Sequence, residues 1–184
     1  MRNLTKVFLL IFVCTCAPIY ADMRTITIEK NYTENSVSIE EFLKTNAKHA
    51  DIMTFTRVPR GLIVSIDEKY LFNKGSSKLK QSGIPVLNDI LQVLKHIGSR
   101  CVIEGHSEKN SFENRPYKSD WELSLLRADN VVKYFILYGG IDAERLFSLG
   151  FGEYMPSVDN VDEKMNINSR IDFVFLDYGK NTRQ

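Results

Sequence analysis

Apolar residues recur at helical spacing in two stretches of the chain. The first keeps one apolar face, formed by Ile84, Leu87, Ile90, Leu91, Leu94 and Ile97. Pro85 is compatible with a first helical turn, and Gly98 stands where such a helix should end. The second stretch begins with a capping box, Ser119 with Glu122, and reaches about Tyr138 before two glycines. The pattern predicts two helices that each turn one face toward a core.

Shorter stretches have the two-residue period or the β-branched content of strands. Met53–Val58 alternates, turn residues follow it, and Leu62–Ile66 is an apolar run rich in β-branched residues, so we predict a hairpin. Further strands are predicted at Cys101–Ile103, Arg145–Leu149 and Arg170–Leu176. Strands that alternate with helices of this length predict an α/β (α+β) sandwich, with one sheet faced by helices.

Residues 1–21 have the features of a secretory signal peptide. Arg2 and Lys6 make a basic start, Val7–Cys14 is an apolar run much shorter than the ~20 residues of a membrane span, and Ala21 is a small residue at the end. Removing this segment lowers the formal net charge from +1 by two, to −1 with neutral histidines. A nucleic-acid partner is disfavoured, because no basic excess is left to replace counterions on phosphates.

The segment between the signal peptide and the hairpin is polar and irregular. Residues 22–56 are therefore predicted to be an arm or linker, with a strand-like Thr25–Ile28. Ser38 with Glu41 offers a capping box for a short helix that reaches about Lys48.

The cysteines exclude an internal disulfide framework. Cys14 and Cys16 fall in the predicted signal peptide, which leaves Cys101 alone and best explained as a small buried core residue. An alternative for Cys16 is acylation as a lipid anchor, although the residues before it match the usual recognition sequence poorly.

Polar residues gather where the Cys101 strand ends and on the helix that follows. Glu108 follows the strand, and Asp120 and Arg127 share one helix face because they are two turns apart. A carboxylate can accept from an ammonium and a guanidinium can hold a carboxylate, so these residues suit an amino acid head group. A solvated face is the alternative.

Chemistry of other kinds has weaker support in the same region. Glu104, His106 and Glu108 alternate and could share one face as metal ligands, but one histidine with two carboxylates is a weak set. Ser124 lies within a helix and has no histidine at a plausible relative position for a hydrolase triad. We therefore predict a binding protein and not an enzyme, with no metal and no cofactor.

The same motifs resemble the C-terminal peptidoglycan-binding domain shared by the OmpA, Pal and MotB proteins of bacterial envelopes. The similarity covers about 120 residues, Arg57 to Tyr178, which leaves residues 179–184 as a tail. Its motifs are Leu71-Phe72-Asn73-Lys74-Gly75 with Leu79, taken as the opening strand and loop, Ile103 to Glu108, Ser119 to Ser124 with Arg127-Ala128, Arg145-Leu146, Gly150 to Glu153 with Pro156 and Asn160, and Asn168 to Ile171.

The resemblance implies a βαβαβ domain with a mixed sheet packed against helices, which binds the peptide stem of peptidoglycan without catalysis. Glu108 and Arg127 match the residues that hold the amino and carboxylate ends of the stem's diamino acid in the family. Ser107, Asp120, Asn168 and Arg170 match further residues around that site. The implied location is the periplasm, in association with the outer membrane and with envelope protein partners.

The chain departs from the family pattern at several positions. Glu replaces Asp at 108, Ser replaces Thr at 107, Ser169 replaces an arginine, and Met165 stands where another arginine is usual. One hypothesis is that the longer Glu108 reaches a shorter diamine, such as lysine or ornithine, in place of diaminopimelate. The alternatives are a wall anchor of a flagellar motor or secretion machine, and a degenerate domain that binds protein partners.

Overall fold

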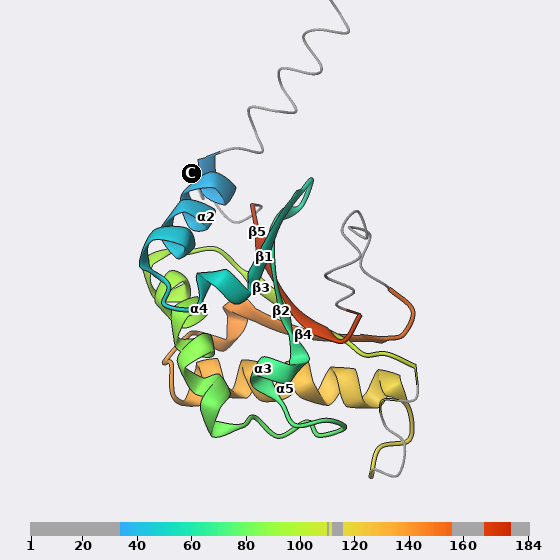
Figure 1. The fold of residues 1–184 in the computed structure, drawn as a ribbon. Helices are drawn as coiled ribbons and strands as arrows, with labels where there is room; N and C mark the ends of the chain where they lie inside the picture. Colours follow the sequence, from blue (N-terminus) through green and yellow to red (C-terminus); the bar gives the residue numbers. More distant parts are fainter. Residues whose placement is uncertain (1–33, 110, 112–115, 156–167, 178–184) are drawn as a thin grey trace, which may run out of the picture. The chain divides into compact units, whose positions relative to one another are not determined.

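A five-stranded sheet in the order β1-β2-β5-β3-β4 forms the centre of the fold (Figure 1). The strands are β1 (Met53–Val58), β2 (Gly61–Asp67), β3 (Cys101–His106), β4 (Leu146–Gly152) and β5 (Arg170–Leu176). Only β3 and β4 are parallel, so the sheet is mixed as predicted. The structure is a computed structural model that describes residues 34–109, 111, 116–155 and 168–177, all within one compact unit, Tyr32–Gln184.

Within the described residues, four helices and three short 3-10 turns accompany the sheet. The helices are α2 (Glu34–Asn46), α3 (Glu68–Leu71), α4 (Ile84–His96) and α5 (Asp120–Leu137), and the turns are η1 (Ala50–Ile52), η2 (Gln81–Gly83) and η3 (Ala143–Arg145). Helix α5 packs so closely on β3 that a Cβ at Gly105 would lie 2.0 Å from the carbonyl oxygen of Ser124. Among the described residues, no helix has the length and apolar content needed to cross a membrane.

Among the described residues, the helices predicted after Gly83 and after Ser119 and the strands predicted at 53–58, 62–66, 101–103, 145–149 and 170–176 are present, with small changes at their ends. The side chain of Ser119 accepts a hydrogen bond from the Glu122 amide at 3.1 Å, which confirms the N-terminal cap of α5. The hairpin is confirmed by the antiparallel pairing of β1 with β2, and Gly61 provides the positive φ of 140° at its turn. Cys101 is buried with a free thiol, and burial raises the pKa of that thiol.

Two local predictions are wrong. Helix α2 begins at Glu34, so Ser38 lies inside the helix and not at its cap. Ser36, Ile39 and Leu43 are buried and follow helical spacing, which extends the packed face N-terminal to the expected cap. The stretch expected to open with a strand at Leu71 instead ends helix α3 there, and only Phe72 and Leu79 form an isolated bridge.

Part of the predicted arm contributes to the hydrophobic core. Ile39 and Leu43 of α2 and Met53 at the start of β1 belong to the same buried cluster as the core strands. The core therefore includes residues N-terminal to position 57. Several predictions lie outside the described residues: the signal peptide, Cys16, the strand at Thr25–Ile28, the segment with Pro156, Asn160 and Met165, and the tail at 179–184.

The two faces of the sheet differ in chemistry. Ile103 of β3 and Phe173 of β5 lie in the apolar cluster that the helices complete, and Gly105 contacts α5. Because side chains alternate along a strand, Glu104 and His106 point to the opposite face. Glu104 is directly across from Asp172 and His106 from Arg170, and all four residues are buried. The strand ends that carry these residues lead into the loops of the candidate site.

Candidate functional site

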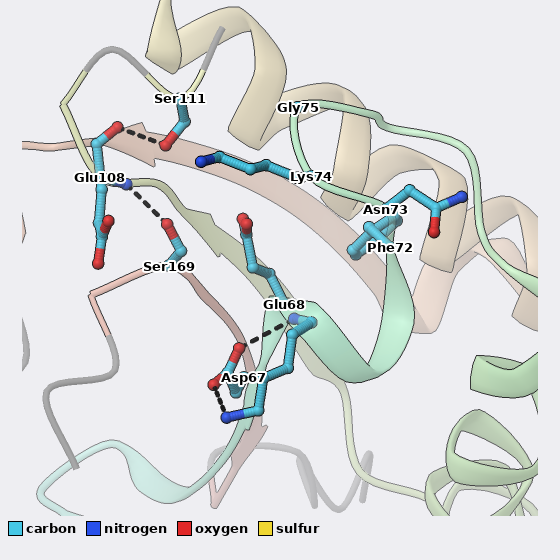
Figure 2. A pocket seen from close by; sticks show the side chains of 10 residues that line it. Asp67, Glu68, Phe72, Asn73, Lys74, Gly75, Glu108, Ser111 and Ser169 are labelled. Carbon is cyan, nitrogen blue, oxygen red and sulfur yellow. Dashed lines mark hydrogen bonds and ion pairs between the residues drawn. The ribbon is translucent and has the colours of Figure 1, made fainter. Parts of the chain in front are cut away.

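A cavity of about 430 Å³ lies where β2, β3 and β5 meet the surrounding loops (Figure 2). Its lining comes from the end of β2, helix α3, the loop after it, the loop after β3 and the residue before β5. The lining residues are Asp67, Glu68, Lys69, Phe72, Asn73, Lys74, Gly75, Glu108, Ser111 and Ser169. A cavity of this size and polar lining fits a small charged group.

Local hydrogen bonds hold the walls of this cavity in place. Asp67 caps α3 by accepting from the Lys69 amide at 2.9 Å, and its carboxylate pairs with the Lys69 ammonium at 2.7 Å. The Glu68 amide donates to the Ser169 carbonyl at 3.0 Å, and the Glu108 amide donates to the Ser169 hydroxyl at 2.8 Å. Ser169 therefore joins the α3 side of the cavity to the loop after β3.

Arg127 lies behind this wall and is fully buried. Its Nε donates to the Ser76 carbonyl at 2.9 Å, its Nη1 pairs with the Glu68 carboxylate, and its guanidinium lies over the Phe72 ring at 5.4 Å. Within the described part of the chain, its Nη2 has no hydrogen-bond partner. The predicted helix arginine is thus present, but Glu68 already neutralises it and it does not line the cavity.

Burial shifts both members of this pair toward their neutral forms. Loss of water raises the pKa of Glu68, and Asp67 and Glu108 raise it further, while Arg127 lowers it by attraction. Burial also lowers the pKa of Arg127, against the effect of Glu68. The ion pair is therefore costly to bury, and removing one partner would leave the other charge without its main compensation.

Glu108 is exposed and its side chain faces solvent and cavity. Among the described residues, its carboxylate makes no hydrogen bond and no ion pair. Glu108 also lines a neighbouring cavity of about 240 Å³, together with Ser107, Lys109, Gly152, Glu153, Met155 and Asn168. The predicted acidic residue is therefore available to a ligand in either cavity.

Ser107 and Asp120 have structural contacts. Ser107 is 1% exposed, its hydroxyl donates to the Asp120 carbonyl at 3.0 Å, and its amide donates to the Gly152 carbonyl at 3.0 Å. Asp120 is also buried, at the first turn of α5. These contacts tie the loop after β3 to α5 and β4, which positions Glu108 beside them.

Asn168 and Arg170 flank Ser169, whose hydroxyl accepts a hydrogen bond from the Glu108 amide. Asn168 lines the smaller cavity, and its buried Oδ1 has no hydrogen-bond partner among the described residues. Arg170 is buried and its Nε donates to both carboxylate oxygens of Asp172, at 3.0 and 2.9 Å. Arg170 therefore stabilises the start of β5 through Asp172. Of these two residues, only Asn168 lines a cavity.

A second cluster of potential ligand atoms lies on the sheet, away from both cavities. It consists of Glu104, His106 and Asp172, with the ligand atoms within 4.8 Å of one another. The third carboxylate or imidazole of this cluster is therefore that of Asp172, and not that of Glu108 as the alternating sequence pattern suggested.

Each carboxylate of this cluster already has a guanidinium partner. Glu104 accepts from Arg60 at 2.9 and 3.0 Å, and Asp172 from Arg170. His106 Nε2 lies 3.2 Å from Asp172 Oδ2, and its ring stacks on Phe151. Burial raises the pKa of Asp172, but His106 and Arg170 outweigh it and the net shift is downward. The donor set is a charge-paired network more than a site for a cation.

Ser124 is engaged in packing contacts and not aligned as a nucleophile. Its hydroxyl donates to the Trp121 carbonyl at 2.9 Å and accepts from the Gly152 amide at 2.9 Å, and the side chain is fully buried. Both roles of the hydroxyl are satisfied within the protein, as expected for a residue that joins α5 to β4.

Sequence reasoning missed the residues that give the main cavity much of its charge. Glu68, Asp67 and Lys74 were not singled out, although Lys74 lies within one of the motifs. Glu68 stands 59 positions before Arg127, and no helical or strand period connects residues that far apart. Only the fold reveals that pair.

The mixed sheet packed against helices defines a small domain of the α+β class, with a charged cavity at its loops. Comparison with known proteins agrees with this description. The model of the OmpA family matches residues 71–170, just over half of the 184 residues. The chain belongs to the OmpA family.

One relative and two solved structures show how far the similarity extends. Motility protein B of Bacillus subtilis is 27% identical over 143 residues, which cover 77% of this chain and 54% of that protein. A MotB-like protein from Desulfovibrio vulgaris has a TM-score of 0.68 at 23% identity, over 85% of this chain and 98% of that chain. The cell wall anchor of the T6SS from Pseudomonas aeruginosa has a TM-score of 0.64 at 26% identity, over 75% and 96%. This chain spans about half the length of the curated relatives that it matches.

Proposed function

We propose that this protein anchors part of a bacterial envelope to the cell wall, by non-catalytic binding of the peptide stem of peptidoglycan. The observation that carries the proposal is the cavity of about 430 Å³, which Glu108, Glu68 and Lys74 all line. Among the described residues, the Glu108 carboxylate has no hydrogen-bond or ion-pair partner. A stem peptide offers amines and carboxylates to such a lining.

The comparisons support wall anchoring within a larger assembly. The relatives include a motility protein and a structure described as a cell wall anchor of a secretion system. A flagellar motor or secretion machine is therefore the kind of envelope partner that we propose, with the periplasm as the location. The signal peptide and the acylation of Cys16 belong to residues outside the described ones and remain predictions from the sequence.

Sedimentation with insoluble peptidoglycan tests this proposal. The purified protein should pellet with the wall, and Glu108→Ala should reduce the pelleted fraction strongly, because it removes a cavity carboxylate that has no partner among the described residues. Glu144→Ala is the matched control, since Glu144 is an exposed acid on η3 that lines neither cavity. Far-ultraviolet circular dichroism should be unchanged in both variants.

The opposite result would also be informative. Wild-type protein that stays in the supernatant at low salt would contradict wall binding, and would favour a degenerate domain that binds protein partners. Release of soluble wall fragments during the same incubation would contradict the non-catalytic proposal.

A further inference from the structure

Some of the charged side chains that line the cavity are already compensated, because they take part in two ion pairs within the protein. Asp67 pairs with Lys69 at 2.7 Å, and Glu68 pairs with Arg127. Each of these side chains therefore has its charge compensated before any ligand arrives. Arg127 is in addition fully buried, so its guanidinium presents no surface to the cavity.

Lys74 is the lining cation without such a partner. It is exposed, and among the described residues it makes no hydrogen bond and no ion pair through its ammonium. Figure 2 shows its side chain extending across the cavity toward the segment that carries Glu108 and Ser111.

The backbone around Lys74 is held in place. Gly75 has a positive φ of 63°, and the Ser76 amide donates to the Asn73 carbonyl at 3.0 Å, which closes a tight turn. This turn sets where the lysine stem leaves the loop, while the long side chain can still adjust to a ligand.

We infer that Lys74 and Glu108 bind the two charged ends of the ligand, with Lys74 taking the carboxylate that the family resemblance assigned to Arg127. The inference rests on the proposed function and names the ligand class within it. A stem residue whose side chain ends in both an ammonium and a carboxylate, as in diaminopimelate, matches Glu108 and Lys74, an acid and a base whose charged groups have no partner among the described residues. Lysine or ornithine, the shorter diamines suggested by the sequence alone, would leave Lys74 without a partner.

Glu68 has a defined part in this arrangement. Its carboxylate pairs with the guanidinium of Arg127, and Glu68 lines the cavity while Arg127 does not. A ligand carboxylate that approached Arg127 would have to displace Glu68 into a wall that already carries Asp67 and Glu108. Binding at Lys74 avoids this repulsion.

Calorimetry with two soluble stem tripeptides tests the inference. One carries diaminopimelate at the third position, and the other carries lysine, which lacks the side-chain carboxylate. Wild type should bind the diaminopimelate peptide about tenfold more tightly, because a charge-assisted hydrogen bond is added. In Lys74→Gln this preference should fall to nearly one, through weaker binding of the diaminopimelate peptide alone.

Two further variants make the test specific. Lys95→Gln is the matched control, because Lys95 is an exposed lysine in the last turn of α4 and lines none of the cavities described here. It should keep the preference of wild type. Glu108→Gln should weaken both peptides, since both present an ammonium.

Several outcomes would overturn the inference. An unchanged preference in Lys74→Gln would do so, as would equal weakening of both peptides. Tighter binding of the diaminopimelate peptide by Glu68→Gln, with Lys74→Gln unaffected, would assign the carboxylate to Arg127 instead. If only this inference is wrong, wild type still binds both the wall and the peptides. If wild type binds neither, the proposed function is wrong as well.

Discussion

The charged residues of the cavity and those of the sheet are the same kinds of side chain in opposite circumstances. On the sheet, Asp172 is 3% exposed and paired with Arg170, and Glu104 is 2% exposed and paired with Arg60. In the cavity, Glu108 and Lys74 are exposed and have no partner among the described residues. Burial with a partner commits a charge to the fold, and exposure without one leaves it available to a ligand.

The Glu68–Arg127 pair is intermediate between these two regions. Arg127 is as buried as the sheet network, yet Glu68 still lines the cavity. Its two members come from α3 and α5, so the pair links the wall of the site to the helix that covers the sheet. A residue matched by sequence to a ligand-binding role can therefore have become part of the scaffold.

The largest effect should come from breaking the sheet network. Asp172→Asn keeps the shape of the side chain but removes the charge that pairs with buried Arg170, so we expect a loss of about 3 kcal/mol in the free energy of unfolding. Asp129→Asn is the matched control, because Asp129 pairs with Lys133 on the exposed side of α5. It should cost less than about 0.5 kcal/mol. Urea unfolding measures both, and equal losses would contradict the contrast between buried and exposed pairs.

The pH dependence of stability should separate the sheet network from the intermediate pair. The pKa of Asp172 lies below its usual value of 3.8 in the folded protein, so its contribution is present above that value and is lost as pH falls through the lowered pKa. The pKa of Glu68 lies above 4.5, so its contribution has the opposite sign: it is fully present below pH 4.5 and is lost as pH rises through the raised pKa.

Urea unfolding of wild type and Glu68→Gln between pH 3 and pH 7 checks this prediction. As pH rises from 4.5 toward neutrality, wild type should lose stability relative to Glu68→Gln, because only wild type releases the Glu68 proton. A wild-type curve that instead gains stability relative to the variant over this range would show that attraction to Arg127 outweighs the cost of burying Glu68.

The fold was largely predictable because its signals are local. Helices α4 and α5 follow an apolar period and carry their own start and stop residues, and the β1–β2 hairpin has its turn within the same stretch. The start of α2 was missed because a Ser-x-x-Glu pattern occurs inside helices as well as at their ends. At the start of α2, the buried face of the helix determines the boundary, and the capping pattern does not.

The candidate site was predictable only in part, because its charge depends on pairings between distant residues. Glu108 was found from its place after β3, and the structure does place it in a cavity. Arg127 was found as well, but its partner Glu68 comes from α3, an element that was not predicted. Lys74 became a candidate only when the pairings of the other lining charges were known.

The smallest effect on stability is expected where the effect on binding should be largest. Lys74→Gln and Glu108→Gln replace exposed side chains that make no described contact through their charged groups, so each should change the free energy of unfolding by less than about 0.5 kcal/mol. Thermal unfolding checks this, with Asp172→Asn as the destabilised reference. Wall binding by wild type should also weaken as NaCl rises from 50 to 500 mM, because exposed charges are screened, while its melting temperature should change little. A Lys74→Gln protein that unfolded as readily as Asp172→Asn would place Lys74 in the scaffold, and the contrast between the two regions would then fail at the residue on which the ligand assignment depends.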